Sequence, residues 1–165
     1  MLRRKTPKIF SMTIVNIVLL VTLLSCNNAT EYPWVIRSDK IIKPVDDSSI
    51  TLALNESTLS EHGAEFTLQN EGRCDFKYGN EYYLQVYTRR KWHEIEIKWD
   101  WTLELYTISP SERKLISFDW QRMYGSLPNG QYRIIYRGWW EDNYDPFFIA
   151  CEFSIEDNQS ETKTG

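Results

Sequence analysis

Few side chains in this chain of 165 residues suit catalysis, because it holds only three cysteines and two histidines. His93 opens the alternating stretch His93-Glu94-Ile95-Glu96-Ile97, where it shares a strand face with Ile95 and Ile97. A metalloprotease motif would need a second histidine one helical turn later, and none is there. No serine-elbow or phosphate-binding glycine pattern follows the leader. The sequence therefore predicts no catalytic residue, no metal site and no cofactor, and an enzyme of unknown class is the last alternative.

Two acidic groups have simpler interpretations than chemistry. Glu94 and Glu96 would share one face of a strand, where neighbouring carboxylates usually form a solvated surface. The segment Glu141-Asp142-Asn143-Tyr144-Asp145 is acidic enough for weak calcium binding, but it lacks the spaced ligands of an EF-hand loop. We expect solvated surface at both places.

The thiol of Cys26 lies where an apolar run gives way to polar sequence. A basic head is followed by a largely apolar run from Ile9 to Leu24, which Asn16 interrupts. This run is shorter than the roughly 20 residues that a membrane-spanning helix needs. A basic head, a short hydrophobic body and a small residue before the break are typical of a secretory signal.

The residues Leu23-Leu24-Ser25-Cys26 resemble the lipobox of bacterial lipoproteins. This resemblance implies that residues 1–25 are a lipoprotein signal peptide, and that Cys26 receives acyl chains and becomes the new N-terminus. The protein would then be anchored in a bacterial cell membrane, on its extracytoplasmic face. An ordinary secretory signal or an uncleaved anchor is the alternative.

The charge balance excludes several partners. The full chain has a net charge of −4 at pH 7, and the leader holds only basic charges, so the remainder is more acidic still. This excludes nucleic acid, whose recognition needs a basic footprint. It also argues against electrostatic adhesion to anionic lipid, so membrane contact is expected through the acyl chains on Cys26.

Three regions follow the signal peptide. Residues 26–49 read as a lipidated N-terminus and flexible tether, in which Trp34-Val35-Ile36 could pack locally, and residues 157–165 as a disordered tail. Between them, residues 50–156 form short runs of alternating apolar and polar residues, with a bulge at Gly79-Asn80. About seven strands at this spacing predict an antiparallel β-sandwich. Its expected core includes Leu52, Phe66, Leu68, Leu84, Tyr132, Ile134 and Phe153.

The second half of this region carries a further resemblance. Phe118-Asp119-Trp120, followed by the segment from Tyr124 to Ile134, is similar to the bacterial Ig-like domains of the Big family, group fourteen, found in small lipoproteins. That family shows a tryptophan and then Tyr-Gly-x-Leu-x-x-Gly-x-Tyr-Arg-Ile. The resemblance covers about residues 50–156, and the insertion Trp99-Asp100-Trp101 and the loop Gly138–Pro146 depart from it.

The resemblance implies an all-β, immunoglobulin-like sandwich with no known catalytic residues. The matching residues would be structural, with Tyr132 placed to form a tyrosine corner whose hydroxyl bonds the preceding backbone. Arg133 and Ile135 would point to the opposite face. The structural motif comprises Tyr124, Gly125, Leu127, Gly130, Tyr132 and Arg133.

Once Cys26 is lipidated, Cys74 and Cys151 remain as an even pair in an oxidising compartment, which permits a disulfide. In an Ig-like sandwich, the strands that lead to these cysteines could bring both thiols to one end of the domain. We therefore expect a Cys74–Cys151 bridge. The alternative is two buried, reduced thiols that act as small apolar residues.

The seven tryptophans and ten tyrosines exceed what the core of a small sandwich can bury. Exposed aromatic rings stack on sugars and supply contact area in protein interfaces. The chain is therefore expected to be a non-catalytic binding or accessory module for an envelope protein, or alternatively for a glycan. The rings could instead pack on each other at the ends of the sandwich. The candidate surface comprises Trp99, Trp101, Trp139, Trp140 and Tyr144.

Replacing Cys26 tests the anchor. The Cys26→Ala variant should stay unprocessed or leave the membrane fraction, because it has no thiol to acylate. Fractionation with and without detergent, together with the intact mass of the product, measures this. Normal maturation with detergent-dependent membrane retention of the variant would contradict the prediction.

Overall fold

The computed structural model describes residues 32–37, 41–45, 48–97 and 100–156. The chain divides after Tyr32 into two compact units, and the second holds every helix and strand described here. Cys26, the signal peptide, Trp99 and the predicted tail 157–165 lie outside the described residues. Within these residues, no helix has the length and apolar character needed to cross a membrane.

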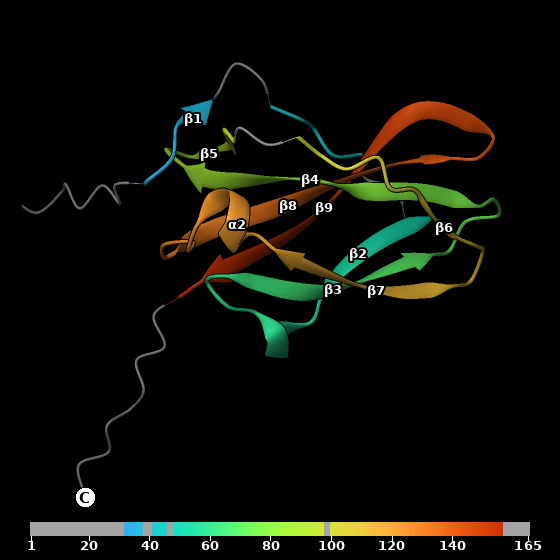
Figure 1. Cartoon of the computed structure of the whole chain (residues 1–165), viewed down its shortest axis with the longest axis horizontal. Helices are drawn as coiled ribbons and strands as arrows, with labels where there is room; N and C mark the ends of the chain where they lie inside the picture. The colour runs from blue at the N-terminus through green and yellow to red at the C-terminus, as the bar shows by residue number, and fades with distance from the viewer. Residues whose placement is uncertain (1–31, 38–40, 46–47, 98–99, 157–165) are drawn as a thin grey trace, which may run out of the picture. The chain divides into compact units, whose positions relative to one another are not determined.

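Two antiparallel sheets form the domain (Figure 1). Sheet A has the order β1-β5-β4-β8-β9, with β6 also paired to β4, and sheet B has the order β2-β3-β7. The predicted all-β antiparallel sandwich is confirmed. The strands are β1 (Ile36–Arg37), β2 (Ile50–Leu54), β3 (Gly63–Asn70), β4 (Phe76–Thr88), β5 (Lys91–Ile95), β6 (Tyr106–Ile108), β7 (Arg113–Asp119), β8 (Gly130–Trp140) and β9 (Asn143–Ile155). The short helices are η1 (Glu56–Thr58) and α2 (Gln121–Tyr124).

Aromatic rings from both sheets interlock in the core. Phe118 of sheet B lies with its ring centroid 4.8 Å from that of Tyr82 and 5.1 Å from that of Tyr136, both in sheet A. Phe66 of sheet B likewise meets Phe153 of sheet A at 6.4 Å. Every core residue predicted from the alternation is buried. The predicted bulge is also present, as a register shift between Tyr78 and Tyr82 where β4 pairs with β8.

The motif around α2 and the start of β8 is structural, as predicted. The Tyr132 hydroxyl donates a hydrogen bond to the Pro128 carbonyl oxygen at 2.7 Å, which is the expected tyrosine corner. The Tyr124 hydroxyl accepts one from the Leu84 backbone N–H at 3.2 Å. Gly125 ends α2 at a φ of 73°, a conformation that costs a residue with a Cβ. Leu127 is buried in the core.

The predicted loop Gly138–Pro146 is wrong, because β8 continues to Trp140 and β9 already begins at Asn143. Gly138 is required within β8, since a Cβ there would lie 2.3 Å from Phe76 Cζ. The sequence suggested a loop because glycine, acidic residues and proline have low strand propensity. Pro146 is tolerated because β9 is an edge strand, paired only with β8 in sheet A.

The predicted tether is also shorter than expected. Ile36 of β1 pairs with Ile95 of β5, and the Val45 backbone N–H donates to the Phe148 carbonyl oxygen at 2.7 Å. The Trp34 indole N–H donates to the Tyr124 carbonyl oxygen. Residues of 33–37 and 41–45 thus pair or hydrogen bond with the sandwich, so these parts of the predicted tether 26–49 belong to the domain.

The predicted disulfide is absent, and Cys74 and Cys151 are both free thiols. The Cys74 thiol contacts the Asp142 carboxylate at 3.7 Å, just before β9 begins at Asn143. Cys151 lies further along β9, and the strand rise from Asn143 to Cys151 is about 26 Å. A disulfide needs Cα atoms about 4.4–6.8 Å apart. The prediction failed because the extended β8–β9 hairpin displaces Cys151 from that end of the domain.

Truncating a core side chain tests the strand register. Ile134 is fully buried, so Ile134→Ala should lower the free energy of unfolding by about 2–5 kcal/mol. Leu115→Ala is the matched control, because Leu115 is 62% exposed on edge strand β7 and should change stability by less than about 0.5 kcal/mol. Urea denaturation measures both. Equal losses in the two variants would show that the register is misassigned.

Candidate functional site

The predicted aromatic surface does not form as one patch. Trp101 packs on the buried Tyr82 with a centroid distance of 5.0 Å. Trp140 packs on Phe76 at 5.0 Å and on Phe147 at 6.2 Å. Both tryptophans are half-buried and pack on core rings, which reduces the ring area that they can offer to a ligand.

Trp139, Tyr144 and Trp99 complete the predicted set. Trp139 points to the face of β8 opposite Trp140, since successive strand residues alternate, and it is half-buried. Tyr144 is 78% exposed in the β8–β9 hairpin. Trp99 lies outside the described residues. The sequence thus grouped residues that the fold distributes over separate places.

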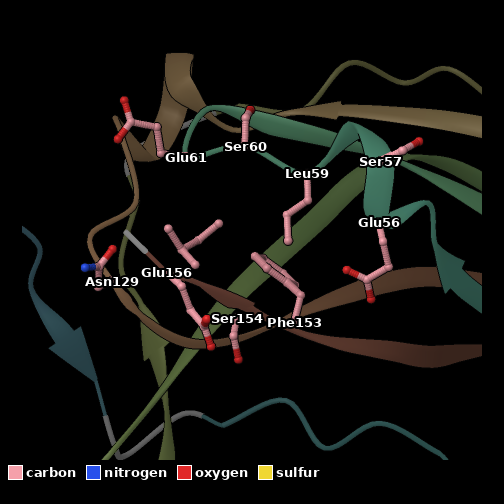
Figure 2. A pocket seen from close by; sticks show the side chains of 10 residues that line it. Glu56, Ser57, Leu59, Ser60, Glu61, Asn129, Phe153, Ser154 and Glu156 are labelled. Atoms are coloured by element: carbon pink, nitrogen blue, oxygen red, sulfur yellow. The ribbon is translucent and has the colours of Figure 1, made fainter. Parts of the chain in front are cut away.

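A polar cavity of about 960 Å³ lies between the η1 loop and the end of β9 (Figure 2). Figure 2 shows Leu59 pointing toward Phe153 across it, with carboxylates from Glu56, Glu61 and Glu156 at its rim. Its lining contains neither a histidine nor a cysteine. The Ser57 hydroxyl donates to Asn55 Oδ1 at 2.8 Å and the Ser60 hydroxyl to the Gly63 carbonyl oxygen, so neither donates to one of these carboxylates as a nucleophile would to its base.

The nearby histidine does not supply such a base. His62 Nε2 lies 3.1 Å from a carboxylate oxygen of Glu61, whereas the Ser60 hydroxyl donates to the Gly63 carbonyl oxygen at 2.9 Å. Serine and imidazole are therefore not linked as a nucleophile and its base would be. Across the described ranges, no group of three or more His, Cys, Asp or Glu residues is arranged to hold a metal ion.

The outer face of sheet A, away from sheet B, carries a more distinctive arrangement. Tyr87, Trp92 and Arg133 come together there from β4, β5 and β8, and we call them the arginine–tryptophan face. The Arg133 Cζ lies 4.4 Å from the Trp92 ring centroid, within the range of a cation–π interaction. The Tyr87 ring meets the Trp92 ring at 5.2 Å and an angle of 61°.

A tight turn brings these rings together. Arg89 and Arg90 have φ angles of 51° and 64°, and β4 and β5 close directly around them with Thr88 paired to Lys91. Positive φ at both central residues is the signature of a type I′ hairpin turn. Lys91 lies outside the turn, because it pairs with Thr88. This register places Tyr87 directly opposite Trp92.

A buried amide fixes the guanidinium over the indole. The Arg133 Nε–H donates to Gln85 Oε1 at 2.7 Å. The Gln85 amide in turn donates to a Glu94 carboxylate oxygen and to the Ile42 carbonyl oxygen, both at 2.9 Å. Gln85 is fully buried, and its amide is satisfied on every side. Arg133 is thereby held in a preorganised position.

Burial shifts the pKa values of Glu94 and Arg133, which both hydrogen bond to Gln85. Burial raises the pKa of the Glu94 carboxyl, and its hydrogen bond from Gln85 and the charge of Arg133 only partly oppose that rise. Burial also lowers the pKa of the Arg133 guanidinium, which the negative charges of Glu152 and Glu94 oppose. Burial thus disfavours the charged form of each group, and the opposite charges nearby only partly offset it.

Recognition is the chemistry that this face can perform. Tryptophan, tyrosine and arginine are the residues most enriched at the energetic centres of protein interfaces. The tilted rings and the guanidinium over Trp92 leave no pair of coplanar rings for a sugar. Sequence reasoning missed the face, although a strict two-residue turn at Arg89-Arg90 would have indicated the Tyr87–Trp92 pair.

The two-sheet topology and the tyrosine corner define an Ig-like module. Residues 46–162 match the family described as the bacterial Ig-like domain, and the chain belongs to that family. No curated protein and no solved structure matches the chain. Bacterial Ig-like domains are typically extracytoplasmic and have surface or accessory roles.

The raised pKa of Glu94 predicts a pH-dependent effect of neutralising it. The folded state holds this proton more tightly than the unfolded state, so Glu94 lowers stability as pH rises above its unfolded pKa of about 4.3. Glu94→Gln should therefore raise the Tm relative to the parent more at about pH 7 than at about pH 4.

Thermal unfolding monitored by circular dichroism at both pH values measures the difference. Glu71→Gln, at an exposed carboxylate, controls for the loss of one negative charge. A Glu94→Gln effect that is the same at both pH values would show that burial does not govern this carboxyl.

Proposed function

We propose that this protein is a lipid-anchored, extracytoplasmic Ig-like module that binds a protein of the cell envelope without catalysing a reaction. The lipobox-like Leu23-Leu24-Ser25-Cys26 supports the anchor, since acylation of Cys26 would hold the domain at the membrane surface. Membership in the bacterial Ig-like family supports the extracytoplasmic location.

The preorganised arginine–tryptophan face carries the proposal for a protein partner. Its rings pack on each other from two paired strands, and the buried Gln85 holds the guanidinium, so these groups lose little conformational freedom on binding. Tyr87 remains 38% exposed and is available for contact. The face thus combines a rigid aromatic surface with a charged group, as a protein interface requires.

A non-catalytic role is supported by the chemistry of the described residues. Beside the polar cavity, Ser60 donates to the Gly63 carbonyl oxygen and His62 contacts Glu61, so these two side chains are not paired as a nucleophile with its base. The Cys74 thiol is a poor nucleophile, because the negative charge of Asp142 raises its pKa above the ordinary value.

Photocrosslinking in living cells tests this function. Benzoylphenylalanine placed at Tyr87 keeps an aromatic ring on the face, and the same residue at Leu115 samples sheet B as a matched exposed control. We expect a crosslinked adduct of discrete mass with one envelope protein from position 87 and none from position 115. Trp92→Thr, which removes the indole but places a residue of high strand propensity there, should reduce the yield at position 87.

The nature of the adduct distinguishes the alternatives. A heterogeneous adduct that carries envelope polysaccharide would support the glycan-binding alternative instead. Equal adducts from positions 87 and 115, or none from either, would refute the assignment of binding to the arginine–tryptophan face.

A further inference from the structure

The segment between β5 and β6 carries two exposed leucines. Leu103 is fully exposed and Leu105 is 56% exposed, while the neighbouring Thr102 and Glu104 are also exposed but hydrogen bond to Asn80 of β4. The Asn80 side-chain amide donates to Thr102 Oγ1 at 3.3 Å and to a Glu104 carboxylate oxygen at 2.6 Å. Alternation along an extended chain then directs both leucines outward.

These contacts fix the leucines outside the core. The Tyr106 hydroxyl donates to the same Glu104 carboxylate oxygen at 2.5 Å, and the hydrogen bonds from Tyr106 and Asn80 lower the pKa of that carboxyl. The Glu104 carbonyl oxygen also approaches Gly79 so closely that a Cβ there would lie 2.9 Å from it. A one-residue slip that buried the leucines would break these bonds.

The exposed leucines lie on the edge of sheet A where the N-terminal chain joins it. β5 and β6 pair with β4 on the side away from β8, and β1 lies outside β5. The Glu96 backbone N–H donates to the Val35 carbonyl oxygen at 3.0 Å, only a few residues before the leucines. Figure 1 shows β1 and the yellow chain that follows β5 on the same side of β4.

Exposed apolar side chains concentrate on this edge. Of the large apolar residues exposed in the described part of the chain, four belong to it: Val35, Leu103, Leu105 and Tyr106. We call these four the leucine edge. A tyrosine beside leucines is a combination suited to the boundary between lipid and water, where the ring is amphipathic.

The length of the tether determines which surface can approach the bilayer. From Cys26 to Val35 the chain spans at most about 30 Å when fully extended. Strand β4, with 13 residues, is longer than this, at about 43 Å. An anchor at Cys26 would therefore keep the domain close to the membrane, and the edge that contains Val35 is the part it restrains most directly.

We propose that the leucine edge rests on the membrane surface, with the side chains of Leu103 and Leu105 inserted among the lipids. The proposal rests on the proposed acylation of Cys26. The contact is apolar, and the chain as a whole is acidic, so it does not depend on anionic lipid. Such an edge-on position leaves both sheet faces, including the arginine–tryptophan face, accessible from the side.

A second copy of the chain fits this edge less well. A stable protein interface buries about 800 Å² on each partner and involves 20–30 residues a side. Four exposed apolar residues along one edge supply much less. A bilayer needs only side-chain insertion there, because acyl chains would already provide the affinity and the leucines would only orient the domain.

Site-directed spin labelling of the mature acylated protein tests the proposal. The protein, with Cys74 and Cys151 replaced by serine, is reconstituted in phosphatidylcholine vesicles and labelled at Leu103→Cys or, as control, at Leu115→Cys. On vesicles, the ratio of oxygen to nickel-chelate accessibility should be severalfold higher at position 103 than at position 115. This difference should persist in high salt, and Leu105→Asn should reduce it.

Flotation of the same vesicles reports the anchor separately. If the protein floats and position 103 is as accessible to nickel chelate as position 115, the leucine edge is not at the membrane, while the anchor stands. A label at position 103 shielded from both reagents would indicate a protein contact and would also overturn the proposal. Protein that fails to float would refute the anchor, and with it the proposed function.

Discussion

The contact of Phe118 with Tyr82 and Tyr136 is the interaction on which the sandwich depends. These rings come from different sheets, so their edge-to-face packing fixes how the sheets are stacked. The Tyr82 hydroxyl also donates to the Asp119 carbonyl oxygen at 3.0 Å, which links β4 to the end of β7. Because Trp120 and α2 follow directly, this one region positions both the core and the tyrosine corner.

The outer face of sheet A is organised by a second constraint, the burial of a polar amide. Gln85 faces away from the core, yet it is fully buried because the chain at Ile42 crosses over it. A buried amide must satisfy its hydrogen bonds, and Gln85 does so with Ile42, Glu94 and Arg133. The N-terminal segment thereby contributes to the position of Arg133 over Trp92.

An Ig-like fold does not specify a function by itself, because many unrelated activities share such scaffolds. What distinguishes this chain is the placement of its exposed side chains. The arginine–tryptophan face lies on regular strands, where positions are more rigid than in loops. Leu103 and Leu105 of the leucine edge lie on an irregular segment that hydrogen bonds to Asn80 at the β4 bulge. The arginine–tryptophan face is suited to binding a partner, and the leucine edge is suited to orienting the domain at a membrane.

Local patterns in the sequence determined the strand faces, the bulge near Gly79 and the tyrosine corner at Tyr132, because alternation and turn chemistry depend on neighbouring residues. The sequence also indicated the bacterial Ig-like family. Only the tertiary structure decided which aromatic rings are buried, where the N-terminal segment packs and how far apart Cys74 and Cys151 lie. These depend on strand length and on contacts between distant segments: Trp101 and Trp140 are half-buried because they pack on Tyr82 and Phe76 of the core.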